Sequence, residues 1–340
     1  MSSSKNQKII VVLGATAAQG NGVVSALLKD SQENWHIRGV TTDASAPWAE
    51  QFRAKYDDAA PGRVSLVSGD VYDTESLKAA FSGAYGIFAM TSELKSKDGQ
   101  PPTEGSRHEV EQGKNIVDVA KQCGLKHFVM STLPDMAKAS SGRYTGMHHM
   151  DHKFEVEQYA KSQLDCVTGV IPGYFYSNHH WPQYCQLRAD GIVRFCCPVP
   201  AAEWVDPAYD VGVFAARIFS LGKDKTAGKD YPVMAPRVNM TDMAATFTRI
   251  TGRKAIYDPI SVDEWADLTA SMIGPAFRED TKQMMEWVAQ IPEDKIVYGA
   301  LDPEEDTSEK ELGVRASTFE EWIKRTAWKG PTEVYHEEAH

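Results

Sequence analysis

The sequence predicts an α/β protein with a Rossmann-type, doubly wound parallel sheet and a smaller, mostly helical C-terminal lobe. Short apolar, β-branched runs alternate with segments of helical periodicity as far as residue 170, as repeated βαβ units require. The first run ends at a glycine-containing turn, and the alternation stops after Pro172. We therefore expect a dinucleotide-binding domain over residues 1–170 and a substrate-binding lobe over residues 171–340, partly interleaved with the sheet.

Composition and charge exclude several other classes of protein. Hydrophobic residues make up 42% and charged residues 24% of the 340 residues, ordinary values for a globular protein. The formal net charge of −11 argues against binding to nucleic acid or to an anionic membrane, because phosphate contacts need clustered Lys and Arg. The sequence shows no signal-peptide core, no membrane-spanning apolar stretch and no Cys-x-x-Cys pair. We expect a cytoplasmic protein with reduced thiols, either a monomer or a homodimer.

Six strands are predicted in the first domain, because each is a short apolar run suited to burial on both faces of a parallel sheet. Helix signals lie between them: Pro47 near a helix start, Asp73 and Thr74 as an N-cap, and Gly124 as a C-cap. The predicted strands are residues 8–13, 35–41, 64–67, 86–90, 127–130 and 166–170.

After Pro172 the chain enters loops rich in aromatic residues and proline, and helical periodicity then returns. We expect the later helices to lie over the carboxyl edge of the sheet, where open α/β sheets bind their ligands. The acidic segment 302–311 has the composition of an exposed linker. The predicted helices of this lobe are residues 208–221, 241–251, 262–273, 279–291 and 318–326.

Gly14 and Gly20 bracket the turn between the first strand and the first helix. The helix points free N–H groups and the positive end of its dipole at this turn, which suits a pyrophosphate. Ala17 stands where a middle glycine is usual, so the spacing alone is a weak signal. The flanking strand and helix favour a dinucleotide loop, as does Gly22, which we expect to allow close helix–sheet packing. The predicted contacts here are Gly14, Thr16, Ala17, Gln19 and Gly20.

The ends of the following strands supply the other predicted cofactor contacts. Thr42 and Asp43 offer an acidic side chain for ribose hydroxyls and no arginine for a 2′-phosphate, which by itself favours NAD. Asp43 is equally well explained as an exposed turn residue. Asp70 and Val71 are placed to meet the adenine, unless Asp70 only caps the next turn. The remaining predicted contacts are Ala89, Met90, Thr91, Lys153, Pro172 and Tyr174.

Several segments together resemble the NmrA-like family, a branch of the atypical short-chain dehydrogenases related to isoflavone reductase-like proteins. The resemblance implies binding of NADP(H) or NAD(H), and on this ground we favour NADP(H), although many NADP-binding members carry an arginine where Thr42 stands. It also implies either reduction of ketones, quinones or enones, often in fungal secondary metabolism, or dinucleotide sensing without turnover. The similar segments are Gly14-Ala15-Thr16 with Gln19-Gly20, Gly69-Asp70 before Thr74, and residues 84–88 and 148–159.

Reduction of a carbonyl needs a proton donor, a cation at the nicotinamide ribose and a hydroxyl group that fixes the reacting oxygen. Short-chain dehydrogenases, which this chain resembles, supply them as Ser and Tyr-x-x-x-Lys. Lys153 stands where that lysine belongs and His149 where the tyrosine belongs, on one face of a helix. Histidine can donate a proton at neutral pH. Ser131 or Thr132 is the expected hydroxyl, and a strand-terminal cap is the alternative for either.

Aromatic residues after the sixth strand are the predicted walls of a substrate site, although such residues could equally be core. The predicted substrate contacts are His148, Tyr174, Phe175 and Asn178, with Trp181 as a lid. His148 and His152 have a spacing that can hold zinc, but no His-Glu-x-x-His pattern accompanies them, so we predict no metal.

These residues together predict an NAD(P)H-dependent oxidoreductase acting on a small hydrophobic carbonyl, quinone or enone-type molecule. One alternative is a non-catalytic NAD(P)-sensing regulator that binds a protein partner. Another is a redox-neutral isomerase or cyclase on the same fold.

Overall fold

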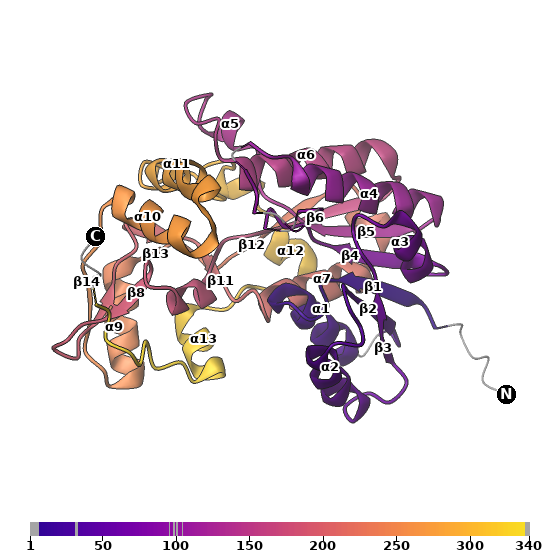
Figure 1. Ribbon diagram of the computed structural model, residues 1–340, viewed down its shortest axis with the longest axis horizontal. Coiled ribbons are helices and arrows are strands. Elements are labelled where there is room, and N and C mark those ends of the chain that lie inside the picture. The colour runs from indigo at the N-terminus through magenta and orange to yellow at the C-terminus, as the bar shows by residue number, and fades with distance from the viewer. Residues whose placement is uncertain are drawn as a thin grey trace.

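A seven-stranded sheet forms the centre of the protein, in the order β12-β6-β5-β4-β1-β2-β3 (Figure 1). The computed structural model describes residues 7–336 apart from residues 31, 32, 95, 98, 100 and 104. All neighbouring strands of this sheet run parallel. The strand order is that of a Rossmann fold with one strand added, so the predicted fold class is confirmed. The strands are β1 (Ile9–Leu13), β2 (His36–Thr41), β3 (Val64–Ser68), β4 (Gly86–Ala89), β5 (His127–Ser131), β6 (Val167–Pro172) and β12 (Asp230–Val233).

The seventh strand, β12, comes from the second half of the chain and was absent from the six predicted strands. It pairs with β6 from Asp230 against Gly169 to Val233 against Pro172. Its sequence carries Pro232 in the middle, and proline normally argues against a strand. Because β12 is the edge of the sheet, the missing N–H of Pro232 costs no ladder hydrogen bond that a further strand would need.

Helices cover both faces of the sheet, and β1 shows how the sequence divides them. Ile10 and Val12 belong to one buried cluster with α1, α2 and α7, whereas Val11 and Leu13 belong to another with α3, α4 and α6. Successive side chains of a strand point to opposite faces of the sheet. Because helices cover both faces, every position of β1 is apolar, and the apolar run in the sequence is uninterrupted. These helices are α1 (Ala18–Lys29), α2 (Pro47–Asp57), α7 (Asp210–Leu221), α3 (Thr74–Phe81), α4 (His108–Gln122) and α6 (His148–Gln163).

Gly22 allows close contact between two helices, not between a helix and the sheet as we expected. A Cβ atom on Gly22 would lie 2.6 Å from the carbonyl oxygen of Ala208, and one on Gly212 of α7 would lie 2.2 Å from the carbonyl oxygen of Gly22. The sequence pattern showed that Gly22 needs a close neighbour but did not identify the neighbour, because α7 follows almost 200 residues later.

Replacing Gly212 with alanine is expected to lower the free energy of unfolding by about 1–3 kcal/mol, the usual cost of overpacking. At an uncrowded helix position the same change is expected to stabilise by roughly 0.5–1 kcal/mol. Urea denaturation of the two proteins distinguishes these signs. An increase in stability would contradict the tight crossing of α1 and α7.

Most of the second half of the chain lies in the left part of Figure 1 and contains four of the five helices predicted for the C-terminal lobe. The fifth, predicted over residues 208–221, is α7, which packs with α1 and α2 against the sheet and does not lie over its carboxyl edge. The other four are α9 (Met240–Thr251), α10 (Val262–Ile273), α11 (Arg278–Val288) and α13 (Phe319–Thr326). Three small sheets accompany them, so this region is less purely helical than predicted. Their strands are only two or three residues long, too short to show a periodic pattern: β7 (Tyr174–Phe175), β8 (Cys185–Leu187), β9 (Val193–Phe195), β10 (Ala201–Ala202), β11 (Trp204–Val205), β13 (Val238–Asn239) and β14 (Ala255–Tyr257).

The acidic segment 302–311 is not the exposed linker that its composition suggested. It includes η3 (Pro303–Glu305) and leads into α12 (Ser308–Leu312), whose Leu312 is fully buried in the cluster that contains α7. Glu311 accepts hydrogen bonds from Lys229 (2.6 Å) and from the Tyr231 hydroxyl (2.8 Å). The prediction failed because one apolar side chain at the end of an acidic run anchors the segment. The remaining short helices are α5 (Met136–Ala139), α8 (Lys223–Thr226), η1 (Tyr176–His180) and η2 (Pro275–Phe277).

Within the described residues, none of the helices combines the length and the apolar character needed to cross a membrane.

Candidate active site

The predicted cofactor residues meet at one edge of the sheet, because the carboxyl ends of parallel strands share an edge. Each strand from β1 to β6 contributes residues at or just beyond its carboxyl end. They are Gly14, Thr16, Ala17, Gln19 and Gly20 after β1; Thr42 and Asp43 after β2; Asp70 and Val71 after β3; Ala89, Met90 and Thr91 at β4; Ser131 and Thr132 at β5; and Pro172 and Tyr174 at β6.

The glycine turn has the geometry of a dinucleotide loop. Gly14 has φ +60°, and its carbonyl oxygen accepts a hydrogen bond from the Ala17 N–H (2.8 Å). A Cβ on Gly20 would lie 2.2 Å from that carbonyl oxygen, so only glycine fits there. Helix α1 has no side-chain cap, and the side-chain oxygen of Gln19 is buried without a hydrogen-bond partner. Open helix N–H groups and an unpartnered acceptor both fit a bound dinucleotide.

Asp43 and Asp70 each form a local turn. Asp43 Oδ1 accepts hydrogen bonds from the N–H (2.8 Å) and the hydroxyl (2.6 Å) of Ser45, and these bonds lower the pKa of this exposed carboxyl. Asp70 Oδ1 accepts from the Tyr72 N–H (3.1 Å). The turn-forming role that we weighed for both residues is therefore present in the structure. Asp43 Oδ2 takes no part in this turn.

A cavity of about 300 Å³ lies between the carboxyl edge of the sheet and the helices α10 and α11. It brings together ten of the predicted residues, including both members of the His149 and Lys153 pair. His148 is not among its lining residues, and its ring instead packs on His152 at 5.5 Å. The predicted residues that line the cavity are Gln19, Ser131, Thr132, His149, Lys153, Pro172, Tyr174, Phe175, Asn178 and Trp181.

His148 thus lies outside the residues that line this cavity, and its assignment to the substrate site stays a prediction. Neighbouring residues of an α-helix point about 100° apart, so placing His149 in the cavity turns His148 away from it. His152 pairs through Nδ1 with Glu93, which is buried and belongs to the segment after β4.

His149 is held by a carboxylate that sequence reasoning missed. Its ring Nδ1 pairs with Asp280 Oδ1 of α11, and its backbone N–H donates to Asp280 Oδ2 (2.9 Å). Burial alone would lower the pKa of His149, but the charge and the hydrogen bond of Asp280 outweigh burial and raise the pKa above its ordinary value. Because Asp280 occupies Nδ1, the second ring nitrogen, Nε2, is the one left for proton transfer.

Lys153 is likewise paired and is not a solvated helix lysine. Its ammonium group pairs with Glu109 of α4 and donates to the carbonyl oxygen of His149 (3.2 Å). Glu109 is fully buried and also accepts a hydrogen bond from the Thr91 hydroxyl (2.5 Å). Its second oxygen, Oε2, is buried without a partner. Glu109 therefore ties the end of β4 to the lysine beside the cavity.

Of the two candidate hydroxyl groups, only that of Ser131 is uncommitted. The Thr132 hydroxyl lies 3.2 Å from the carbonyl oxygen of Lys153 and 3.3 Å from Glu157 Oε2, so it links β5 to α6. Thr132 also lines the cavity, so its assignment as the catalytic hydroxyl stays a prediction, and these two contacts fix its side chain. The Ser131 hydroxyl makes no hydrogen bond within the described part of the chain and lines the cavity.

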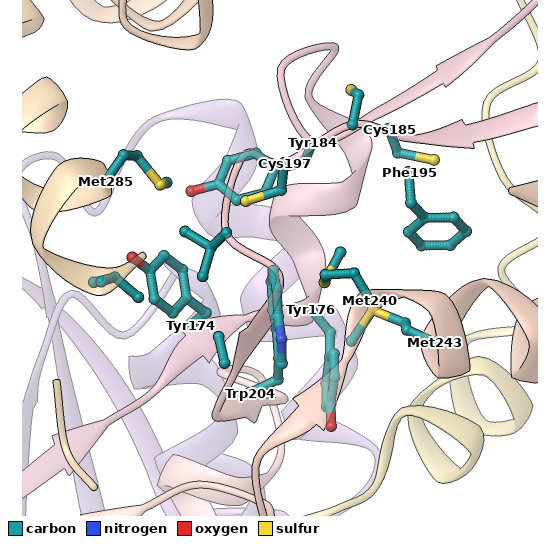
Figure 2. Packing of buried hydrophobic residues seen from close by; sticks show 14 of the residues in the cluster. Tyr174, Tyr176, Tyr184, Cys185, Phe195, Cys197, Trp204, Met240, Met243 and Met285 are labelled. Atoms are coloured by element: carbon teal, nitrogen blue, oxygen red, sulfur yellow. The ribbon is translucent and has the colours of Figure 1, made fainter. Parts of the chain in front are cut away.

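Aromatic rings form the far wall of the cavity. Tyr174 packs against Tyr298 (ring centroids 5.4 Å apart) and against Trp204 (5.3 Å), and Figure 2 shows Tyr184 above the same cluster. The Tyr174 hydroxyl is buried without a partner, and burial raises its pKa well above the ordinary value. Trp181 lines the cavity but is 36% exposed, which places it at the margin. The wall is thus apolar with isolated polar atoms, as small-molecule sites usually are.

Asp280 and Glu109 carried no recognisable signal in the sequence. Asp280 lies 131 residues from His149, and Glu109 lies 44 residues from Lys153. Both are acidic residues in the first turn of a helix, where such residues are common because they stabilise the helix dipole. An alignment of relatives is the signal that could single them out.

The fold and the site together define a Rossmann-fold protein with an aromatic cavity and a paired histidine and lysine at the carboxyl edge of its sheet. The chain belongs to the NmrA-like family, whose model matches residues 6–323. The family assigned by resemblance in the sequence is therefore confirmed.

Relatives and solved structures agree with this placement. The NmrA-like family domain-containing oxidoreductase himF of Aspergillus japonicus is 32% identical over 269 residues, covering 75% of this chain and 76% of its own. The corresponding oxidoreductase lnaB of Aspergillus flavus is 28% identical over 271 residues, covering 76% and 77%. Both relatives are named as oxidoreductases.

Two solved structures show the same fold. NmrA, a negative transcriptional regulator, in complex with NADP, has a TM-score of 0.71 at 20% identity and 94% coverage of each chain. An NADPH-dependent quinone oxidoreductase from Escherichia coli, complexed with NADPH, has a TM-score of 0.67 at 20% identity, covering 94% of this chain and 99% of its own. The fold is therefore shared by a regulator and by a reductase.

Proposed function

We propose that the protein is an NAD(P)H-dependent oxidoreductase that reduces a small hydrophobic carbonyl, quinone or enone-type molecule. The observation that carries the proposal is the single cavity lined by His149, Lys153 and Ser131, next to Gln19 of the glycine turn. The names of the fungal relatives and the quinone oxidoreductase fold support it. Secondary metabolism, which the family resemblance implies, is part of the proposal.

A nicotinamide dinucleotide is the cofactor that we propose, with NADP(H) favoured and NAD(H) as the alternative. NmrA structures hold either NAD or NADP. The turn from Gly14 to Gly20 would hold the pyrophosphate, and Lys153 the nicotinamide ribose. The buried, unpartnered oxygens of Gln19 and Glu109 fit a ligand that donates hydrogen bonds. When bound, the reduced cofactor would supply a hydride to the substrate carbon.

The side chains around the cavity donate the proton and stabilise the charge that develops on the substrate oxygen. As the substrate carbon accepts the hydride, the electron pair of the C=O bond moves to oxygen, and His149 donates its proton there from Nε2. Asp280 keeps the histidine oriented and favours its charged form. The Ser131 hydroxyl donates a hydrogen bond to the same oxygen, and the Lys153 charge favours the developing negative charge. With a carbonyl substrate the product is an alcohol, and His149 takes up a proton from solvent afterwards.

Purified protein mixed with NADPH or NADH and a panel of quinones, aromatic ketones and enones tests the proposal. Substrate-dependent loss of the nicotinamide absorbance is expected. No turnover with any of them, combined with tight binding of the oxidised cofactor, would reject the reductase and favour a sensor.

Replacing Asp280 with asparagine is expected to change the pH dependence of the reaction. The proton donor must be protonated, so the rate falls as pH rises through the pKa of His149. Asp280 raises that pKa, so its loss should move the fall to lower pH by about one unit or more, the usual effect of a neighbouring opposite charge. Rate against pH measures the shift, and the exposed neighbour Glu279, changed to glutamine, is the control. Identical pH profiles for the wild type and both variants would show that Asp280 does not set the pKa of the proton donor.

The second candidate function is a dinucleotide-sensing regulator with a protein partner. It is favoured by one specific observation, the presence of His149 where short-chain dehydrogenases carry a tyrosine. NmrA itself is a negative transcriptional regulator. For either function we propose a cytoplasmic monomer or homodimer that binds neither nucleic acid nor membranes, with residues 1–170 holding the dinucleotide and residues 171–340 completing the site.

A further inference from the structure

The loop after β2 has a fixed shape. The Ala44 N–H donates to the Ser68 hydroxyl of β3 (3.0 Å), and Asp43 and Ser45 close a turn within the loop. One guanidinium nitrogen of Arg53, from the middle of α2, donates to the carbonyl oxygen of Ala44 (2.6 Å). Arg53 is therefore positioned against the loop that follows β2, although it lies eleven residues beyond Thr42 in the sequence.

The Arg53 guanidinium forms no ion pair with a carboxylate among the described residues. Arg53 is half-buried and uses one N–H group on a backbone carbonyl. Arg53 differs from the other arginines without an ion pair to a described residue in contacting the loop that follows β2, at the carboxyl edge of the sheet. An arginine has five N–H donors in a planar fork that matches the geometry of a phosphate.

We propose that Arg53 binds the 2′-phosphate of NADP(H), in place of an arginine at position 42. This inference rests on the proposed binding of a dinucleotide. In Rossmann folds the adenine ribose lies at the end of the second strand, and a nearby arginine accommodates the 2′-phosphate when one is present. Thr42 and Ser45 are exposed residues of the same loop, and the Ser45 hydroxyl donates to Asp43. NADP(H) is then selected by a helix residue that a motif centred on position 42 does not include.

Asp43 is the charge that opposes this assignment, because its carboxylate would repel a 2′-phosphate and suits the free ribose hydroxyls of NAD(H). One of its oxygens is already held by the backbone and the hydroxyl of Ser45. The balance between attraction of the 2′-phosphate by Arg53 and its repulsion by Asp43 therefore decides the preference between NADP(H) and NAD(H). To this balance the guanidinium contributes charge-assisted hydrogen bonds, which are about twice as strong as neutral ones.

Equilibrium binding tests the inference without any turnover. Tryptophan fluorescence is titrated with NADPH, NADH, 2′,5′-ADP and 5′-AMP for the wild type, Arg53→Met, Arg53→Lys and the control Lys55→Met. Lys55 lies on the same helix but is held by Asn21 Oδ1 (2.6 Å). Methionine keeps the apolar stem of Arg53, and thermal denaturation verifies that each variant folds.

The wild type is expected to bind NADPH more tightly than NADH. Arg53→Met should weaken NADPH and 2′,5′-ADP by about tenfold or more, as loss of a charged hydrogen bond predicts, and leave NADH and 5′-AMP nearly unchanged. Arg53→Lys should retain part of the preference, and Lys55→Met all of it. Equal weakening of both dinucleotides, or tighter binding of NADH by the wild type, overturns the inference while leaving the proposed reductase intact. Failure to bind either dinucleotide overturns both.

Discussion

Replacing His149 with glutamine should lower the rate constant for reduction by about 100- to 10,000-fold, the range that a general acid contributes. The glutamine amide can still donate a hydrogen bond to Asp280, so the buried carboxylate keeps a partner and the fold is expected to survive. Only the transferable proton is lost. The binding of the dinucleotide should change little, because in our account His149 acts on the substrate oxygen.

Steady-state kinetics with saturating reduced cofactor measures this effect, and a binding titration of the same variant is the control. A rate within about threefold of wild type, too small a change for loss of a general acid, would show that another group supplies the proton. Ser131 is then the side chain to test, because its hydroxyl also faces the cavity.

Replacing Lys153 with methionine is expected to abolish reduction and to lower stability as well. The ammonium group pairs with Glu109, which is fully buried. Removing one partner of a buried ion pair leaves an unpaired charge and costs about 3 kcal/mol or more. A loss of activity in this variant alone would therefore have two possible causes.

The double variant Lys153→Met, Glu109→Gln separates the two causes. It removes the charged pair together, so denaturation should show a recovery of most of the lost stability. In our account it stays inactive, because the cation at the nicotinamide ribose is still missing. Recovery of reduction together with stability would mean that Lys153 only maintains the fold.

Local sequence patterns were sufficient for the parts of this protein that depend on neighbours in the chain. The strand, glycine turn and helix around Gly14 obey short-range rules of backbone geometry and helix capping. The same holds for His149 and Lys153, whose common face follows from four-residue spacing on one helix. The same helix register turns His148 away from the residues that line the cavity.

The remaining features arise from contacts between distant segments. Strand β12 is recognisable only beside β6, since Pro232 hides it from any strand pattern. Asp280 and Glu109 contact the cavity residues His149 and Lys153 from helices whose sequences show only an ordinary amphipathic pattern. Arg53 likewise becomes meaningful only when α2 folds back on the loop after β2.

The most direct test of the central claim follows the hydride itself. Reduced cofactor carrying deuterium at both positions of nicotinamide C4 is incubated with the protein and a ketone or enone that it turns over, and the product is examined by mass spectrometry and NMR. Our account predicts deuterium from C4 on the carbon of the former carbonyl or conjugated bond, and little or no labelled product from the His149→Gln and Lys153→Met variants over the same early times. Product that carries no deuterium from the cofactor would contradict hydride transfer at this site and with it the assignment as a reductase.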